Sequence, residues 1–394
     1  MKAQIVIDTS FGDGGKGLTV DNLCRQAVLR GESVAVVRFS GGQQCGHTVI
    51  REGIKHVFST YGSGTLQGIP TYYTEHATMS LQATLTEYFA LREKCIEPKL
   101  YFHPQTRLTT PYDVAYNRAK ESAAYSGGRA GDVRHGSCGM GVGATLKRHD
   151  ETPYKIYVSD LLYPQLLRQK LDGIKMYYAR KVHSEALNDS DGLGHGQSFY
   201  SAFHSEVNEQ LESFEAALEL SKEHVAFEIA NLYPNQFRNL IYEGSQGVLL
   251  DMDHGIFPNV TYGNTTCKNA IEHASRLGIR DIELFYVSRC YLTRHGRGWM
   301  PNETEIKLVN TDEEINVTNP WQEHLRIGEL DYDLIDYALT VDNGYHRDSY
   351  RRNMVITCLD QRPDWKLDTT RLPYYIQGVY TNASPQADSW VLAK

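Results

Sequence analysis

The chain of 394 residues is long enough for a large hydrophobic core, and its 41% hydrophobic and 22% charged residues are ordinary for a globular protein. Its formal net charge of −8 argues against wholesale binding to nucleic-acid phosphates. The seven cysteines are odd in number and form no CxxC pair, which argues against a disulfide framework or a zinc site and predicts a reducing cytoplasm. The N-terminal apolar stretch is too short for a signal peptide, and we expect no membrane-spanning segment.

Short apolar runs alternate with helical patterns along the chain. Strands are predicted at 4–10, 33–42, 239–247, 282–293, 354–361 and 374–380, helices at 16–31 and 206–232, and a polar loop at 186–198. This alternation predicts an α/β fold with a mostly parallel central sheet flanked by helices, similar to P-loop NTPases. Because the chain has no internal repeat and no linker-like segment, we expect one catalytic domain over residues 1–394 with helical and loop insertions.

The segment SFGDGGKGL (10–18) follows the first predicted strand. Ligands in such sheets bind beyond the carboxyl ends of the strands. The four glycines let backbone amides approach a phosphate, and Lys16 supplies a positive charge. The segment is not a regular Walker A loop, because Gly17 stands where a Ser or Thr would follow the lysine. Asp13 is then the residue that could bind magnesium instead. The alternative is a glycine-rich turn with an exposed aspartate.

A second glycine-rich turn, GGQQCGHT (41–48), follows the next predicted strand and contains His47. Two such turns at adjacent strand ends could bring Asp13 and His47 together, one as a base and the other as an acid or oxyanion donor. A single histidine, taken alone, is more often structural. A third strand end, at 242–255, places Glu243 and Gln246 beside an apolar run.

Together these segments resemble the adenylosuccinate synthetase family. That family carries a GDEGKG loop, a GG-x-NAGHT turn, an EGAQG-x-LLD-x-DHG segment and an STR-x-G-x-G segment. The corresponding segments in this chain, in the same order, read GDGGKG (12–17), GGQQCGHT (41–48), EGSQGVLLDMDHGIFP (243–258) and LTRHGRGWMPNE (292–303). The resemblance extends from residue 4 to about residue 361.

The resemblance implies a ligase that couples aspartate to a 6-oxopurine nucleoside monophosphate, using a nucleoside triphosphate and Mg²⁺. It implies that Asp13 is the base and a magnesium ligand, that His47 stabilises charge on O6 and the transferring phosphate, and that Lys16 and Gln246 complete the catalytic set. Gly46 would give a backbone oxygen to the metal. The implied nucleotide- and phosphate-binding residues are Gly12, Gly14, Gly15, Gly17, Gly46, Thr48 and Asp360. The implied purine- and substrate-phosphate residues are Gln44, Ser137, Cys138, Arg148, Gln246 and Thr261, and the implied aspartate-binding residues are Thr318, Asn319 and Arg326.

One departure from the family pattern concerns the purine. The family's glutamate after the catalytic aspartate is here Gly14. We interpret this as a hole that admits the 2-amino group of guanine, which favours GMP or dGMP as substrate. The chain then resembles the bacteriophage 2-aminoadenylosuccinate synthetases, and it would act in the host cytoplasm. The alternatives are IMP as substrate, with drift at a tolerant turn, and a non-catalytic nucleotide-binding protein.

A second departure from the family pattern concerns the phosphate donor. The family's TKLD segment is TCLD (357–360) here, so that Cys358 replaces a lysine that would stack on guanine. We therefore expect ATP or dATP as donor, with GTP as the alternative. The resemblance also implies a homodimer, in which Arg148 is our candidate for an arginine that crosses to the partner subunit.

Overall fold

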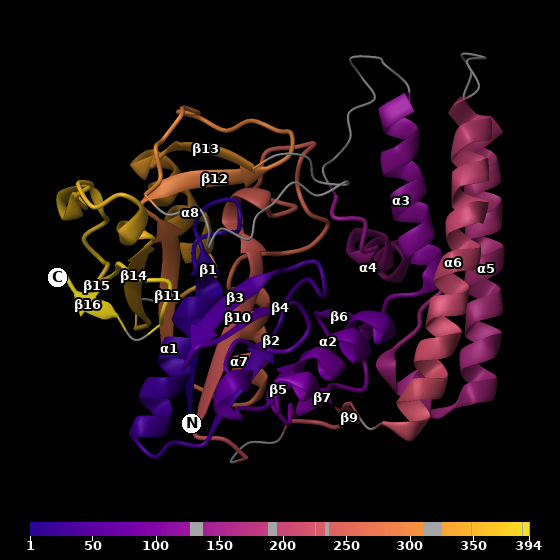
Figure 1. Ribbon diagram of the computed structural model, residues 1–394, viewed down its shortest axis with the longest axis horizontal. Helices are drawn as coiled ribbons and strands as arrows, with labels where there is room; N and C mark the ends of the chain where they lie inside the picture. Colours follow the sequence, from indigo (N-terminus) through magenta and orange to yellow (C-terminus); the bar gives the residue numbers. More distant parts are fainter. Residues whose placement is uncertain are drawn as a thin grey trace.

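A ten-stranded sheet forms the centre of the computed structural model, which describes residues 1–126, 137–187, 195–224, 226–232, 236–309, 325–347, 349–387 and 389–393 (Figure 1). Its strands, in spatial order, are β16 (Trp390–Leu392), β15 (Gly378–Asn382), β14 (Arg351–Thr357), β11 (Asp281–Arg289), β1 (Lys2–Asp8), β10 (Asn239–Gly247), β2 (Val34–Arg38), β5 (Thr71–Tyr73), β7 (Leu100–Phe102) and β9 (Glu228–Ile229). Every neighbouring pair is parallel except β15 and β16. The predicted α/β fold with a mostly parallel sheet is confirmed.

Helices cover both faces of this sheet, as its apolar strands require. The helices of the described part of the chain are α1 (Lys16–Leu29), α2 (Leu81–Glu93), α3 (Pro111–Ser126), α4 (Val142–Glu151), α5 (Pro164–Leu187), α6 (His195–Glu223), α7 (Lys268–Arg276) and α8 (Tyr332–Asn343). Alternate residues of β1 face opposite sides. Val6 packs in one apolar cluster with residues of α1, whereas Ile5 and Ile7 pack in another with residues of α7 and α8. The central strands are thus buried on both faces.

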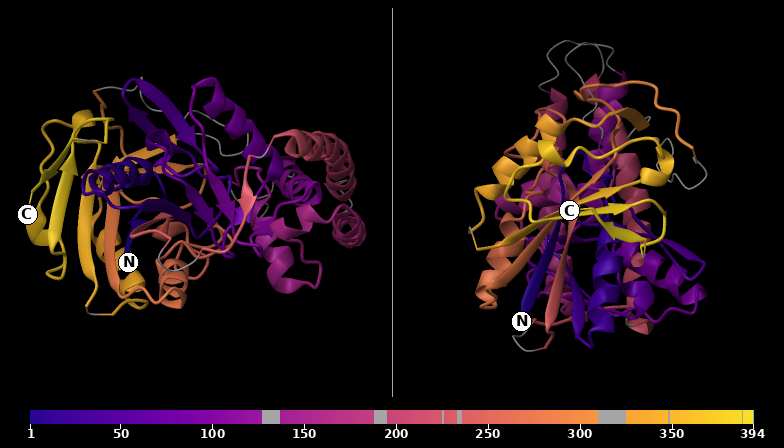
Figure 2. Two further views of the ribbon diagram at one scale, coloured as in Figure 1. Left: turned by 90° about the horizontal axis from the view of Figure 1, so that it is seen from below. Right: turned by 90° about the vertical axis from the view of Figure 1, so that its left-hand side faces the viewer.

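A bundle of long helices stands at the β5–β7–β9 end of the sheet (Figure 1), at the opposite end from the C-terminus (Figure 2). Helices α2, α3, α5 and α6 share one apolar cluster, which also contains Tyr73 of β5 and Phe102 of β7. The bundle is therefore joined to the sheet through common packing.

Small two-stranded sheets complete the described structure. They pair β3 (His47–Arg51) with β4 (Ile54–Phe58), β6 (Thr78–Met79) with β8 (Arg107–Leu108), and β12 (Tyr291–His295) with β13 (Leu325–Glu329). The strand predicted at 282–293 is therefore two strands: β11 lies in the central sheet, and β12 leaves it to pair with β13. This turn carries the segment 292–303 away from the sheet and over the strand ends.

Two boundary predictions were wrong. Residues 195–198 belong to α6 and 186–187 to α5, whereas 188–194 lie outside the described residues. Phe199, Phe203 and Val207 are spaced four residues apart and buried, and this helical spacing explains why α6 begins upstream of the predicted helix. The helix also ends earlier than predicted, at Glu223, and the chain enters the sheet as β9.

Candidate active site

Three glycine-rich segments meet at the carboxyl edge of the sheet because they follow adjacent strands. The loop 9–15 follows β1, the loop 39–46 follows β2, and Gln246 lies at the end of β10, which pairs with both strands. In parallel sheets ligands bind at this edge. The three segments singled out from the sequence are thus brought together.

Two cavities open along this edge. The first, which we call the Lys16 cavity, has a volume of about 160 Å³, and the second, the Gln246 cavity, about 570 Å³. Both cavities are lined by Gly12, Asp13, Gly46 and His47. The larger volume is within the range of small-molecule sites. The site therefore has two compartments that meet at one carboxylate and one imidazole.

Most of the predicted residues line one of these cavities. Gly15, Lys16, Gly17, Thr48 and Asp360 line the Lys16 cavity, and Gln44, Ser137, Cys138, Gln246 and Thr261 line the Gln246 cavity. The predicted nucleotide-binding residues and the predicted purine- and substrate-phosphate residues named here therefore lie in different cavities.

Asp13 is held by its backbone and leaves its carboxylate at the junction. Its carbonyl oxygen accepts a hydrogen bond of 2.6 Å from Arg289 Nε. Its Oδ2 lies 3.5 Å from both Thr293 Oγ1 and His295 Nε2, and its side chain is 22% exposed. These long contacts leave the carboxylate accessible to a proton donor or a metal ion in the cavities.

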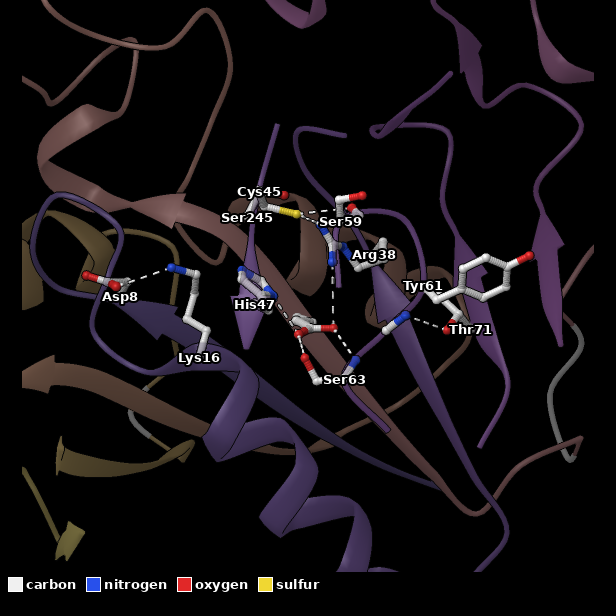
Figure 3. Close-up of polar contacts among 12 residues, drawn as sticks. Asp8, Lys16, Arg38, Cys45, His47, Ser59, Tyr61, Ser63, Thr71 and Ser245 are labelled. Atoms are coloured by element: carbon white, nitrogen blue, oxygen red, sulfur yellow. Dashed lines mark hydrogen bonds and ion pairs between the residues drawn. The ribbon is translucent and has the colours of Figure 1, made fainter. Parts of the chain in front are cut away.

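His47, the first residue of β3, is oriented by a buried carboxylate from β10 of the central sheet. Its Nδ1 lies 2.6 Å from Glu243 Oε1, and Ser63 and Arg38 also contact this carboxylate (Figure 3). Burial alone raises the pKa of Glu243, but His47 and Arg38 outweigh it and lower that pKa to about 2. Burial also lowers the pKa of His47, against the opposing effect of Glu243. In a neutral imidazole that donates Nδ1–H to Glu243, the other ring nitrogen, Nε2, is an acceptor. Nε2 is buried without a partner among the described residues.

Lys16 lies at the first turn of α1, and its ammonium contacts a carboxylate that the sequence reasoning missed. Its Nζ is 3.2 Å from Asp8 Oδ2 (Figure 3). It also donates to the carbonyl of Gly12. Asp8 and Lys16 both have side chains that are 0% exposed. Burial raises the pKa of Asp8, but Lys16, Ser10 and Gly14 together hold it below its usual value.

The interpretation of Gly14 as a hole beside the purine was wrong. A Cβ at this position would lie 2.7 Å from Asp8 Oδ2 and 2.9 Å from the carbonyl oxygen of Val287, so the space is already filled. The Gly14 amide donates to Asp8 Oδ2 at 2.6 Å instead of facing a phosphate, and Gly14 lines neither cavity. Its lack of a side chain therefore reflects the neighbouring Asp8.

The role predicted for Arg148 was also wrong. This residue is buried, and its side chain donates from Nε and Nη2 to Asp113 at 2.9 and 2.8 Å. It also donates to the carbonyl of Tyr154, so it is an internal ion pair that cannot cross to a partner subunit. The neighbouring Lys147 lines the Gln246 cavity, together with the first turn of α4.

The predicted aspartate-binding residues are only partly described. Thr318 and Asn319 lie outside the described residues. Arg326 on β13 pairs in register with Arg294 on β12, and it donates to Glu303 Oε2 at 3.0 Å and to the Gly298 carbonyl at 2.6 Å. Burial, with Arg326 nearby, lowers the pKa of Arg294 to about 10. Arg294 itself is buried, donates to the carbonyls of Trp299 and Asn259, and lines the Gln246 cavity.

Sequence reasoning missed Asp8, Arg294 and His295 as parts of the site, and it placed Glu243 at a strand end without giving it a role. Glu243 and Arg294 lie within the quoted segments EGSQG and LTRHG, so their positions beside Gln246 and in the STR-like motif were available signals. His295 approaches Asp13 only because β12 turns back over the strand ends, and nothing in its local pattern indicates this.

An α/β fold with a glycine-rich loop after β1, and with two compartments that meet at Asp13 and His47, is typical of nucleotide-binding proteins. The family model for adenylosuccinate synthetase matches residues 5–366. The chain belongs to the adenylosuccinate synthetase family, whose members are carbon–nitrogen ligases.

Two relatives of known family agree with this assignment. An adenylosuccinate synthetase of Xylella fastidiosa (strain M12) is 32% identical over 312 residues, which cover 78% of this chain and 66% of that protein. One from Pseudomonas paraeruginosa (strain DSM 24068 / PA7) is 30% identical, covering 77% of this chain and 65% of that protein. The chain thus spans about two thirds of the length of these relatives.

Two solved structures share the fold. Fully ligated adenylosuccinate synthetase from Plasmodium falciparum superposes with a TM-score of 0.67 at 16% identity, covering 100% of both chains. Succinoaminodeoxyadenylate synthetase of cyanophage S-2L, bound to dGMP and to dATP as an energy donor, gives a TM-score of 0.60 at 14% identity, covering 99% of this chain and 95% of that one. Within the described part of the chain, the helices lack the combination of length and apolar content that crossing a bilayer requires.

Proposed function

We propose that this chain is a ligase that uses a nucleoside triphosphate to join L-aspartate to C6 of a purine nucleoside monophosphate. The observation that carries the proposal is the meeting of the Lys16 and Gln246 cavities at Asp13 and His47. A triphosphate in the first cavity and a purine in the second would bring the γ-phosphate and the purine O6 to the same two side chains. Such positioning supplies a large part of the acceleration in phosphoryl transfer.

The proposed chemistry assigns one task to each central side chain. Asp13 takes the N1 proton of the purine, so that O6 becomes nucleophilic and attacks the γ-phosphorus. The bond to the bridging oxygen breaks, the nucleoside diphosphate leaves, and the purine carries a 6-phosphoryl group. His47, oriented by Glu243, stabilises charge on O6 and on the transferring phosphate. The amine of aspartate then attacks C6, and the phosphate leaves. Lys16 holds a phosphate oxygen of the donor.

Mg²⁺ is the metal that the family resemblance implies, and the residues present fit it. Asp13 offers a partly exposed carboxylate, and Gly46, the proposed source of a backbone oxygen, lines both cavities. Oxygen atoms of this kind are the ligands that Mg²⁺ prefers. The bound ion would offset the repulsion between the Asp13 carboxylate and the phosphates.

The remaining roles follow from the lining of the two cavities. Gln44 and Gln246 would contact the purine, and Ser137, Cys138, Thr261 and Lys147 its 5′-phosphate. Arg294 and Arg326 would bind the aspartate carboxylates, together with Thr318 and Asn319.

We further propose that residues 1–394 act as one catalytic unit and that the protein is a cytoplasmic homodimer. Arg148 has no part in that dimer's active site.

We propose GMP or dGMP as the purine substrate, and ATP or dATP as the donor. The support for guanylate is the shared fold with the cyanophage enzyme, whose structure holds dGMP and dATP. The second candidate is IMP, because the relatives at 30% and 32% identity are adenylosuccinate synthetases. Gly14 no longer distinguishes the two, since Asp8 fills the space beside it.

The test is an assay of phosphate release with L-aspartate and Mg²⁺. IMP, GMP and dGMP are compared as substrates, and each is combined in turn with ATP, dATP and GTP as the donor. Asp13→Asn is the control, because the amide cannot accept the N1 proton; turnover should fall by on the order of 10²–10⁴-fold while the fold is kept. A kcat/KM that favours IMP would identify an ordinary adenylosuccinate synthetase. Nucleotide binding without aspartate-dependent phosphate release would identify a non-catalytic protein.

A further inference from the structure

Asp8, the last residue of β1, is a buried carboxylate to which the proposed reaction gives no task. Its Oδ1 accepts hydrogen bonds from the amide and the hydroxyl of Ser10, at 2.8 and 2.7 Å. Its Oδ2 accepts from the Gly14 amide at 2.6 Å and from Lys16 Nζ at 3.2 Å. A carboxylate has about four acceptor positions, and the loop after β1 supplies a donor for each. Asp8 is therefore directed at the protein's own loop, with no acceptor left over for a ligand.

The loop has room for only one acidic side chain at this place. The Cβ of any residue at position 14 would lie 2.7 Å from Asp8 Oδ2, closer than real side chains approach, and the carbonyl oxygen of Val287 limits the space on the other side. A longer side chain at position 14 would overlap sterically with the Asp8 carboxylate. Asp8 and Gly14 are thus complementary: the strand supplies the carboxylate, and the loop supplies the vacant Cβ position.

The bond from Lys16 to Asp8 matters for phosphate binding because an ammonium has three donors. Two of them are directed to Asp8 Oδ2 and to the carbonyl of Gly12, and Lys16 lines the Lys16 cavity. Fixing two donors fixes the direction of the third. Removal of Asp8 would free the side chain to rotate and would leave a buried positive charge without its partner.

We propose that Asp8 is the positioning residue of the phosphate-binding loop: it aims Lys16 at the donor's phosphates and takes the place of an acidic side chain at position 14. The inference rests on the proposed function only in taking the Lys16 cavity as the site of a triphosphate. Asp8 touches no substrate and acts through Lys16.

The experiment measures equilibrium binding of ATP and of inorganic tripolyphosphate, each with Mg²⁺, to the full chain and to three variants. Asp8→Gly should weaken both affinities by roughly 10–100-fold, as expected for a misaligned hydrogen bond to a charged group. Gly14→Glu should lower the melting temperature and abolish binding. The double variant, Asp8→Gly with Gly14→Glu, should bind at least 10-fold more tightly than either single variant, because the relocated carboxylate can again hold Lys16.

A matched control separates positioning from general loss of stability. Asp113→Asn breaks another buried ion pair, with Arg148, whose two side chains are also 0% exposed and line neither cavity. It should lower the melting temperature while leaving the affinity for tripolyphosphate unchanged. The proposal is overturned if Asp8→Gly binds tripolyphosphate like the parent, if the double variant is no better than the single ones, or if the parent binds neither probe. Absence of phosphate release in a parent that binds both probes would contradict the ligase assignment alone.

Discussion

The Nδ1 atom of His47 and the Oε1 atom of Glu243 lie 2.6 Å apart, in a region where both side chains are almost fully buried. They come from different strands, β3 and β10, so that the pair also links the loop after β2 to the centre of the sheet. Because one ring nitrogen is bound to Glu243, the other is left for the junction of the two cavities. The reactivity proposed for His47 thus depends on a residue that lines neither cavity.

Glu243→Gln should lower kcat by about 10–100-fold with little change in KM. The reason is that an amide can hold the ring but does not fix its tautomer or stabilise an imidazolium, and positioned acid–base groups contribute about 10²–10⁴-fold. Steady-state kinetics measures this split. Glu209→Gln, on the exposed side of α6, is the control and should leave both constants unchanged. An unchanged kcat in Glu243→Gln would show that His47 needs no such partner.

The same carboxylate predicts a pH dependence of stability. The interactions in the folded protein lower the pKa of Glu243 to about 2, whereas a glutamate without such interactions has a pKa of 4.5. Between these values the unfolded chain binds a proton that the folded chain does not. The contribution, about 3 kcal/mol, is therefore complete above pH about 4.5 and is lost as the pH falls toward 2. Urea unfolding at several pH values should show a stability gap between parent and Glu243→Gln that narrows below pH 4.5. A gap independent of pH would contradict the ion pair.

How much of this could be read from the sequence depended on whether a feature is local. The strands at 4–10 and 239–247 and the loops that follow them were predictable, because a buried parallel strand and a glycine-rich turn leave patterns within ten residues. Gly14 was misinterpreted because the side chain that requires a glycine there, Asp8, lies six residues earlier in the chain and fills the space beside it. Arg148 was misread because a charged residue on a helix pattern does not reveal a buried partner such as Asp113.

Arg148 and Lys147 are adjacent cations, but replacing Arg148 should reduce stability, whereas replacing Lys147 should weaken substrate binding. Arg148→Ala leaves the Asp113 carboxylate buried and unpaired, and should cost about 3–5 kcal/mol of folding free energy. Lys147→Ala should change stability by less than about 0.5 kcal/mol but raise KM for the nucleoside monophosphate by about tenfold, the value of one charge-assisted hydrogen bond.

Chemical unfolding and steady-state kinetics on the two variants make this comparison. Mixing Asp13→Asn with Arg148→Ala should restore no activity, since Arg148 lies inside its own subunit. Restored activity after confirmed subunit exchange would show that Arg148 leaves its internal pair in the assembled protein. An unchanged KM in Lys147→Ala would remove that residue from the substrate-phosphate site.

The last prediction concerns the donor base. Thr357, the last residue of β14, lines the Lys16 cavity together with Cys358 and Asp360, which follow the strand. The base of the triphosphate would extend here from the phosphates. Asp360 can accept hydrogen bonds from amino groups of adenine or guanine, but Cys358 gives no cation to stack on a base. We therefore expect kcat/KM for ATP and dATP to be at least equal to that for GTP.

Cys358→Lys should shift the GTP/ATP ratio of kcat/KM toward GTP by roughly 3–30-fold, which corresponds to about 0.5–2 kcal/mol of cation–π stacking. Cys358→Met is the matched control, because it adds length without charge and should leave the ratio near that of the parent. A strong preference for GTP in the parent chain would mean that Asp360 alone selects guanine. In that case the replacement of a stacking lysine by Cys358 would have no bearing on the choice of donor.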